Sequence, residues 1–283
     1  MSKIFIGIQS CKEKESRKEA CRKTWLKDLD YDKYEYMFYQ GGYEGPEPFL
    51  IEGDTISFRT PKPRKVEMWA SYTDLENIEG EPIRTSEDSF PVGIKTLDNK
   101  IYLGQDIFRK VVSEHRLAIQ WLHLTSQLKA ICLWCLENKD PSFFVKLDDD
   151  DYVVGENFNK IDPTPYDYYG YFNSTDWLWA FGSGYFINNK CLRIFCNNSS
   201  QQQLADINIR CCHMDDCAMG YTLNAHCKDI VRQHEPQMKP WRPEYHEPLL
   251  SLEESKQLIL SHGYENLGHM LDMRHRMNQI LSK

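Results

Sequence analysis

The feature that most constrains this chain is an apolar run that ends in four consecutive acidic residues, FFVKLDDDDYV at residues 143–153. Residues 143–147 form a short, nearly uninterrupted apolar run, which is typical of a strand covered on both faces of a sheet. Ligands of open α/β sheets gather at the carboxyl ends of the strands, and the acidic residues begin at that end. Four neighbouring carboxylates repel one another, so a folded site that keeps them together needs a cationic partner.

Two interpretations of the acidic run remain open on local grounds. Hard oxygen ligands at the end of a rigid strand suit Mg²⁺ or Mn²⁺, whereas an exposed acidic turn would only point into solvent. An EF-hand is excluded because, counting from Asp148, Val153 stands where the loop needs glycine. A phosphatase-like aspartate nucleophile lacks an evident lysine and second acidic loop.

The pattern around this strand predicts a single α/β domain over residues 1–283. Alternation at 3–9 predicts a strand, and Ser16 with Glu19 predicts the capped start of a helix over 16–26. Residues 41–95, rich in Gly, Pro and acidic side chains, indicate long excursions over the sheet. The remaining predictions are strands at 34–39, 166–172 and 179–187, a long helix over 105–138, a helix start at 215–223, and terminal helices at 251–261 and 272–281.

Charge and composition exclude some classes of function. The chain has 34 Lys and Arg against 42 Asp and Glu, a net charge of −8, and no long basic run, which argues against a nucleic-acid binder. No window of about eighteen apolar residues appears, so we expect no membrane anchor or signal peptide and a cytoplasmic location. Ten cysteines without regular spacing favour reduced thiols.

A second acidic pair, Asp215 and Asp216, opens the helix predicted at 215–223. Acidic residues stabilise helix N-termini through the backbone dipole, so capping is one interpretation and a general base is the other. Between the two acidic sites, residues 177–187 combine aromatic rings with Gly182 and Gly184. Glycines allow a backbone to approach a ligand closely, and aromatic rings suit either a sugar platform or the core.

In this order, the motifs resemble the fringe and β-1,3-glycosyltransferases, family 31 of the inverting glycosyltransferases. The first is Ser10-Cys11 followed by a helix that ends in Arg22-Lys-Thr-Trp25. The second is a segment over 123–129, in which the lysine is displaced by about two positions from the family's place. The others are Lys146-Leu-Asp-Asp-Asp-Asp-Tyr-Val153 for the family's DxD strand, Gly182-Ser-Gly-Tyr-Phe-Ile187, and Asp215-Asp-Cys-Ala-Met-Gly220. Segments 41–95 and 236–283 carry no clear family motif.

The resemblance implies a GT-A fold, one Rossmann-like domain with a mixed, mostly parallel sheet flanked by helices. About residues 1–150 would bind the nucleotide sugar, about 151–250 the acceptor, and 251–283 would form C-terminal helices. Mn²⁺ or Mg²⁺ would bridge the DxD aspartates and the diphosphate of a UDP-sugar. Asp150 is the first choice for direct metal contact, with Asp148 as its partner. Asp148 and Asp149 would then contact the donor ribose and sugar, or coordinate the metal through water.

Further site residues follow from the same resemblance. Asp216 is the leading candidate for the base that takes the acceptor proton, and Asp215 is close behind. His234 is the nearest match to the family's metal-binding histidine, with His226 and His246 as competitors. Arg17 and Arg22 would meet the nucleotide or form the polar face of their helix, and Gly182 and Gly184 would lie against the donor.

The expected function is therefore metal-dependent, inverting transfer of galactose, N-acetylglucosamine or xylose from a UDP-sugar to a glycan or glycoprotein acceptor. The alternatives are a sugar-nucleotide or glycan-binding module without turnover and a metal-dependent phosphohydrolase. A chain of this kind without an anchor suggests a microbial or viral member, in the latter case acting in the host cytoplasm.

Overall fold

The computed structural model describes residues 3–60, 64–69, 80–83, 93–96, 101–103, 117–122, 124–172, 178–182, 184–199, 215–241 and 250–282. Within them, the strands of the central sheet are β1 (Ile4–Gln9), β2 (Tyr34–Gln40), β3 (Phe49–Glu52), β4 (Thr55–Phe58), β10 (Phe143–Asp148), β12 (Tyr168–Gly170), β13 (Tyr185–Asn188) and β14 (Arg232–His234). Their order is β14-β12-β13-β10-β1-β2-β4-β3, and four of the seven neighbouring pairs are parallel. The predicted α/β class with a mixed, mostly parallel central sheet flanked by helices is confirmed.

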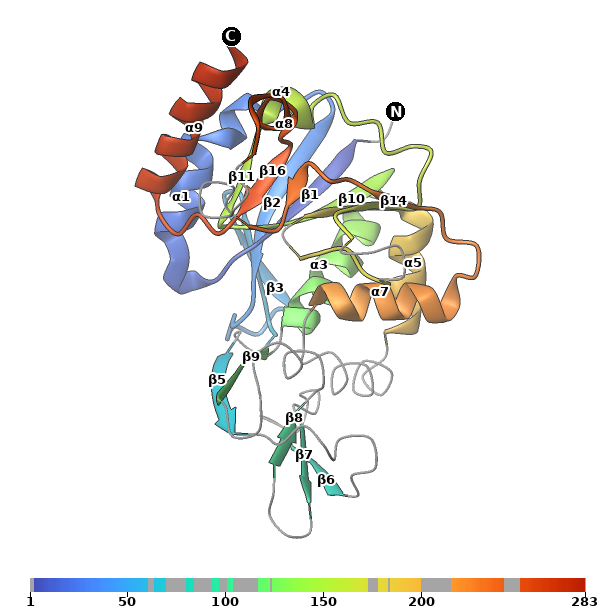
Figure 1. Ribbon diagram of the computed structural model, residues 1–283. Helices are drawn as coiled ribbons and strands as arrows, with labels where there is room; N and C mark the ends of the chain where they lie inside the picture. Colours follow the sequence, from blue (N-terminus) through green and yellow to red (C-terminus); the bar gives the residue numbers. More distant parts are fainter. Residues whose placement is uncertain are drawn as a thin grey trace.

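Helices cover both faces of this sheet (Figure 1). On one face lie α1 (Glu15–Lys23) and α9 (Leu267–Leu281), and on the other lie α3 (Leu124–Asn138), α5 (Asn189–Asn198) and α7 (Asp215–His226). Strand alternation explains the two layers, because Ile6 and Ile8 pack under α1 while Phe5 packs toward α3. β10 is buried on both faces, as its apolar run predicts.

A small sheet extends the central strand beyond the acidic run. It contains β11 (Asp151–Val153), β16 (Leu260–His262) and β15 (Met238–Lys239), and it places His262 directly opposite Asp151. The short helices η1 (Lys12–Lys14), η2 (Trp25–Asp28), α4 (Gly155–Phe158) and α8 (Leu252–Gln257) complete this part. Two further sheets, β5 (Arg64–Trp69) with β9 (Leu117–Leu122) and β6 (Gly80–Ile83) with β7 (Gly93–Thr96) and β8 (Ile101–Leu103), are drawn below it in Figure 1.

Several predicted boundaries are wrong. The helix expected from residue 105 begins at Leu124, because residues 117–122 pair with β5 instead. Ser16 lies inside α1 and does not cap it, since the helix begins at Glu15 without a side-chain cap. The helix expected over 251–261 ends at Gln257, and the strand expected over 179–187 occupies only 185–188. In the first and third cases, pairing with a strand distant in sequence overrides local periodicity.

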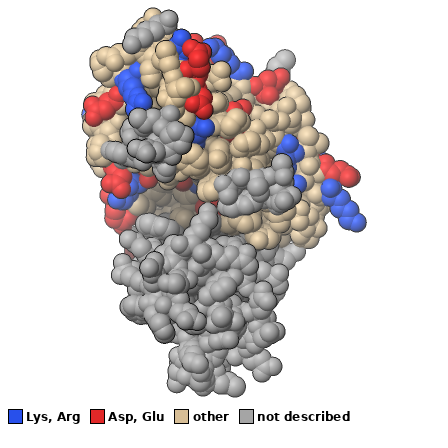
Figure 2. Space-filling model, in the orientation of Figure 1, with Lys and Arg blue, Asp and Glu red and all other residues tan. Residues whose placement is uncertain are grey.

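Within the residues that the structure describes, the further features of note are the thiols, the distribution of surface charge and the hydropathy of the helices. Eight cysteines are free thiols, while Cys211 and Cys212 lie outside the described ranges. Figure 2 shows basic and acidic side chains interspersed over the described part of this face, with no single-sign patch there. Among the described helices, none combines the length and the apolar character needed to cross a bilayer.

Candidate active site at the end of the central strand

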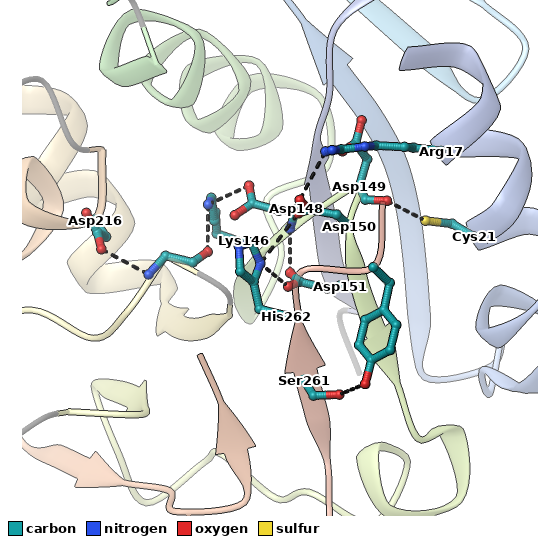
Figure 3. Close-up of polar contacts among 12 residues, drawn as sticks. Arg17, Cys21, Lys146, Asp148, Asp149, Asp150, Asp151, Asp216, Ser261 and His262 are labelled. Carbon is teal, nitrogen blue, oxygen red and sulfur yellow. Dashed lines mark hydrogen bonds and ion pairs between the residues drawn. The ribbon is translucent and has the colours of Figure 1, made fainter. Parts of the chain in front are cut away.

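The acidic run forms a tight turn between β10 and β11 (Figure 3). The turn is held from three sides by main-chain contacts. Asp149 N donates to Gln9 O at 3.0 Å, and the Cys21 thiol donates to Asp149 O at 3.3 Å. Gly263 N and Tyr264 N both donate to Asp150 O, at 3.0 and 2.8 Å. The acidic turn is therefore a fixed part of the fold and does not project freely into solvent.

Asp149 and Asp150 share one cationic partner from the first helix. Arg17 Nη1 lies 3.3 Å from Asp149 Oδ1 and 3.0 Å from Asp150 Oδ2. The Ser10 hydroxyl donates to Asp149 Oδ2 at 2.6 Å. Burial raises the pKa of Asp149 to about 6, although the Ser10 hydrogen bond and the Arg17 charge oppose that rise. α1 thus supplies a cation to the middle of the run, and the first loop supplies a hydrogen bond.

Asp151 and His262 form a pair on the far side of the turn. Asp151 is fully buried, its Oδ1 lies 2.8 Å from His262 Nδ1, and its Oδ2 accepts from Asp148 N at 2.6 Å. Burial alone would lower the pKa of His262, but the Asp151 contact and the charges of Asp150 and Asp148 raise it to about 9. Burial of Asp151 favours its protonated form, yet the short contact with a protonated imidazole supports an ion pair.

Ligand atoms of Asp148, Asp151 and His262 all lie within 4.8 Å of one another. Two carboxylates and an imidazole are a donor set that suits Mn²⁺ and tolerates Mg²⁺. The residues present therefore fit a divalent cation. Asp150, the first choice from sequence, lies outside this group, although its Oδ1 is 3.4 Å from His262 Nδ1.

Lys146 lies beneath the ligand group and is 1% exposed. Its Nζ is 2.7 Å from Asp148 Oδ1, 2.6 Å from Gly182 O and 3.5 Å from Asp215 Oδ2. Burial alone would lower its pKa, but the charges of Asp148 and Asp215 raise it, so the side chain is an ammonium group. This cation joins the acidic run to the second acidic pair.

Asp215 and Asp216 occupy the first turn of α7 and are 5% and 6% exposed. Asp216 Oδ2 accepts from Gly182 N at 2.9 Å, and its Oδ1 accepts from Cys217 N at 2.7 Å. Burial and the neighbouring Asp215 charge raise the pKa of Asp216 to about 7, and burial raises the pKa of Asp215 as well. A carboxylate with this pKa is suited to general base catalysis near neutral pH.

The described residues bring six carboxylates against three cations at this end of the sheet. The cations are Arg17, Lys146 and His262. The carboxylates are those of Asp148, Asp149, Asp150, Asp151, Asp215 and Asp216. The three cations allow the run to stay together, and the remaining excess of negative charge, largely shielded from water, favours binding of a further cation.

Two of the predicted donor-binding residues lie elsewhere. Arg22 Nη2 pairs with Asp54 at 2.7 Å and its guanidinium lies over the Phe38 ring, so the structure does not bring it to the aspartates of the site. A Cβ on Gly184 would lie 2.6 Å from Leu260 Cδ2 and 3.1 Å from Leu147 Cδ2. Gly184 therefore serves core packing in this structure. Arg17, Gly182 and the six aspartates, by contrast, are assembled in one site.

The histidine that joins the site is one that the sequence analysis missed. His234 is exposed, its Nδ1 accepts from Phe172 N at 3.1 Å, and it lies outside the ligand group. His226 is exposed at the end of α7, and His246 lies outside the described residues. The alternating segment Leu260-Ser-His262 before Gly263 is a weak strand signal that could have indicated His262.

Aromatic residues of the 177–187 segment divide between core and site rim. Tyr185 and Phe186 are fully buried in the core, and Trp177 lies outside the described residues. Trp179 stacks on Tyr221 with ring centroids 5.2 Å apart. Phe181 precedes Gly182 and packs edge-on against Tyr171 at 5.7 Å. Only part of this segment remains available as a sugar platform.

Comparisons with known proteins place the chain near no established family. No protein-family model matches it, and no curated protein matches it. Similar solved structures include a glycosyltransferase involved in the glycosylation of the major capsid of PBCV-1, with 11% identity, a TM-score of 0.44, and coverage of 98% of this chain and 99% of that chain. GlyE from Streptococcus pneumoniae TIGR4 has 13% identity, a TM-score of 0.40, and coverage of 84% and 46%. The galactosyltransferase LgtC, in complex with donor and acceptor sugar analogues, has 10% identity, a TM-score of 0.42, and coverage of 98% and 95%. At TM-scores of 0.44 or less, these matches establish neither the family nor the reaction of this chain.

Proposed function

We propose that this chain is a metal-dependent inverting glycosyltransferase of the GT-A type that moves a sugar from a UDP-sugar to a hydroxyl of a glycan acceptor. The observation that carries the proposal is the pairing of two acidic sites at the end of β10. A group suited to a divalent cation and a buried carboxylate pair are linked there by one lysine. Transfer from a nucleotide sugar needs both parts, one for the leaving diphosphate and one for the acceptor proton.

Asp148, Asp151 and His262 would hold the metal, Mn²⁺ or Mg²⁺. When bound, the cation supplies positive charge that stabilises the departing diphosphate. Because His262 carries a proton in the metal-free state, metal binding must displace that proton, so affinity should rise with pH up to about 9. Arg17 and Asp149 lie on the side of the turn nearest the first loop, where they would orient the nucleotide and its ribose.

Asp216 is proposed as the general base, with Asp215 beside it as the charge that keeps its proton affinity high. The Gly182 and Cys217 amides fix both Asp216 oxygens, which orients the carboxylate. Phe181 and Tyr171, next to Gly182, are proposed to contact the acceptor sugar. Galactose, N-acetylglucosamine and xylose are the proposed donors, and the cytoplasmic setting stays a prediction.

The test combines binding and turnover. The protein is incubated with Mn²⁺ and a panel of UDP-sugars, with and without simple glycoside acceptors, and UDP release and thermal melting are followed. We expect Mn²⁺-dependent stabilisation by UDP and slow release of UDP from at least one donor. Asp216→Asn should retain the stabilisation and lose transfer. Binding without turnover would favour a binding module, and phosphate release from monoesters would favour a phosphohydrolase.

A further inference from the structure

Lys146 contacts three elements that are separate in sequence. Its ammonium group meets Asp148 at the end of β10, Gly182 O in the 178–182 segment, and Asp215 in the first turn of α7. Burying an ammonium group costs free energy unless charged and polar partners surround it. Lys146 makes two hydrogen bonds, to Asp148 and Gly182, and one ion pair, to Asp215 at 3.5 Å, so its buried charge has partners on all three elements.

Gly182 extends this connection to the proposed base. Its carbonyl oxygen accepts from Lys146 at 2.6 Å, while its own N–H donates to Asp216 Oδ2 at 2.9 Å. Gly182 therefore connects Lys146 to Asp216 through two hydrogen bonds, one at its carbonyl oxygen and one at its N–H. A Cβ on Gly182 would sit 3.4 Å from both Lys146 Nζ and Asp216 Oδ2, which places the glycine directly between them.

α7 packs so closely against the 178–182 segment that a displacement of one would move the other. A Cβ on Gly220 would lie 2.4 Å from Trp179 Cβ and 2.5 Å from Leu178 O, so the helix and the 178–182 segment are in backbone contact. Closely packed elements of this kind move together. Lys146 therefore fixes the distance between the ligand group and the acidic pair through two routes, one through Asp215 and one through Gly182.

We propose that Lys146 is a positioning residue that couples the two halves of the reaction site, holding Asp148 on the metal side and Asp216 on the acceptor side at a fixed separation. The inference rests on the proposed function for its catalytic meaning, but the coupling itself is a property of the fold. Transfer requires both groups in productive geometry at once, and a misplacement of about 1 Å costs on the order of 100-fold in rate.

The experiment measures hydrogen exchange by mass spectrometry together with sugar transfer. Wild type is compared with Lys146→Met, which keeps the length of the side chain and removes the charge, and with the milder Lys146→Gln. The control is Lys33→Met, because Lys33 also donates to two main-chain carbonyls, those of Asn159 and Ile161, but precedes β2 at the end of the sheet opposite to the acidic turn.

In wild type, we expect the Gly182 amide to be strongly protected although it lies in a turn. In Lys146→Met, exchange over 178–182 and the first turn of α7 should accelerate at least tenfold while β1 and β2 stay unchanged, and transfer should fall at least 100-fold. Lys33→Met should alter neither.

An unprotected Gly182 amide in wild type overturns the inference even if the Lys146 variants fail to fold. Acceleration spread evenly over the chain, or normal transfer by Lys146→Met, also overturns it. A wild-type protein that transfers no sugar overturns the proposed function, and the exchange data then decide the coupling separately.

Discussion

Arg17 and Arg22 lie five residues apart on α1 but serve different parts of the molecule. At about 100° of rotation per residue, the two side chains point about 140° apart around the helix. Arg17 reaches the acidic turn, whereas Arg22 packs over Phe38 and pairs with Asp54. The sequence motif makes both arginines candidates for the site. Only the fold shows that Arg17 belongs to the site and that Arg22 holds α1 against the sheet.

The Asp54 carboxylate gives a stability prediction with a defined pH dependence. Burial alone would raise its pKa, but hydrogen bonds from Arg22 and Tyr36 and the Arg22 charge lower it below 3.8. Its contribution is therefore present above pH 3.8 and is lost as the pH falls through the lower folded value. Asp54→Asn should reduce the free energy of unfolding by about 1 kcal/mol at pH 7 and by less near pH 3. Urea titrations at both pH values check this, and an equal difference at both would contradict it.

Gly182 and Gly184 have different surroundings, because Gly182 lies between Lys146 and Asp216 whereas Gly184 lies against core side chains. A side chain at position 184 meets Leu260, Leu147 and Met238 in the core, so Gly184→Ala should cost about 1–3 kcal/mol of unfolding free energy. Gly182→Ala finds only ordinary contacts at 3.4 Å and should change stability by less than about 0.5 kcal/mol. If donor or acceptor approaches the backbone there, Gly182→Ala should still lower transfer. Denaturant melts and UDP-release assays on both variants decide the assignment.

At the scale of elements, the sequence predicts what local patterns encode and fails where distant pairing decides. The apolar run 143–147 predicts β10 and its ligand end correctly, because a fully buried strand has a composition of its own. The sequence predicts a helix over 251–261, but the helix that the Ser251–Glu254 capping box begins ends at Gln257, and residues 260–262 form β16. The strand exists because β11 pairs with it, about 110 residues earlier in the chain. His262 was missed for that reason.

The close packing of α7 against the 178–182 segment predicts that a substitution within α7 lowers sugar transfer by moving the helix. Gly220→Ala adds a methyl group that meets the backbone of Leu178 and Trp179, so α7 must move away. We expect a loss of about 1–3 kcal/mol in unfolding free energy and a larger loss of transfer than of Mn²⁺–UDP binding, because the shift displaces Asp216. Asn224→Ala, on the exposed face of the same helix, is the control. Equal losses of binding and transfer would contradict a displaced base.

At the scale of the whole molecule, the site gathers four parts of the chain that are far apart in sequence. α1 supplies Arg17, the turn between β10 and β11 supplies four aspartates, α7 supplies Asp215 and Asp216, and β16 supplies His262. Each part contributes a charge that is unfavourable when buried alone. The site is therefore complete only in the fully folded chain, and a bound cation, by offsetting the excess carboxylates, should stabilise the global fold and not only the turn.

Because a bound metal stabilises the folded chain, thermal melting in the presence of Mn²⁺ can identify the histidine that binds it. A ligand at a concentration of 100 times its dissociation constant stabilises the folded state by about 2.7 kcal/mol, which for a chain of this size raises the melting temperature by several degrees. Mn²⁺ should produce such a rise in wild type after prior removal of metal with a chelator. His262→Ala should lose the Mn²⁺-induced rise, since it removes one of three ligands, whereas His234→Ala should retain it, because His234 lies outside the ligand group. Differential scanning fluorimetry over a Mn²⁺ series, with Mg²⁺ in parallel, measures both. If His234→Ala lost the rise and His262→Ala kept it, the metal would lie with the histidine favoured by sequence resemblance, and His262 would be only the structural partner of Asp151.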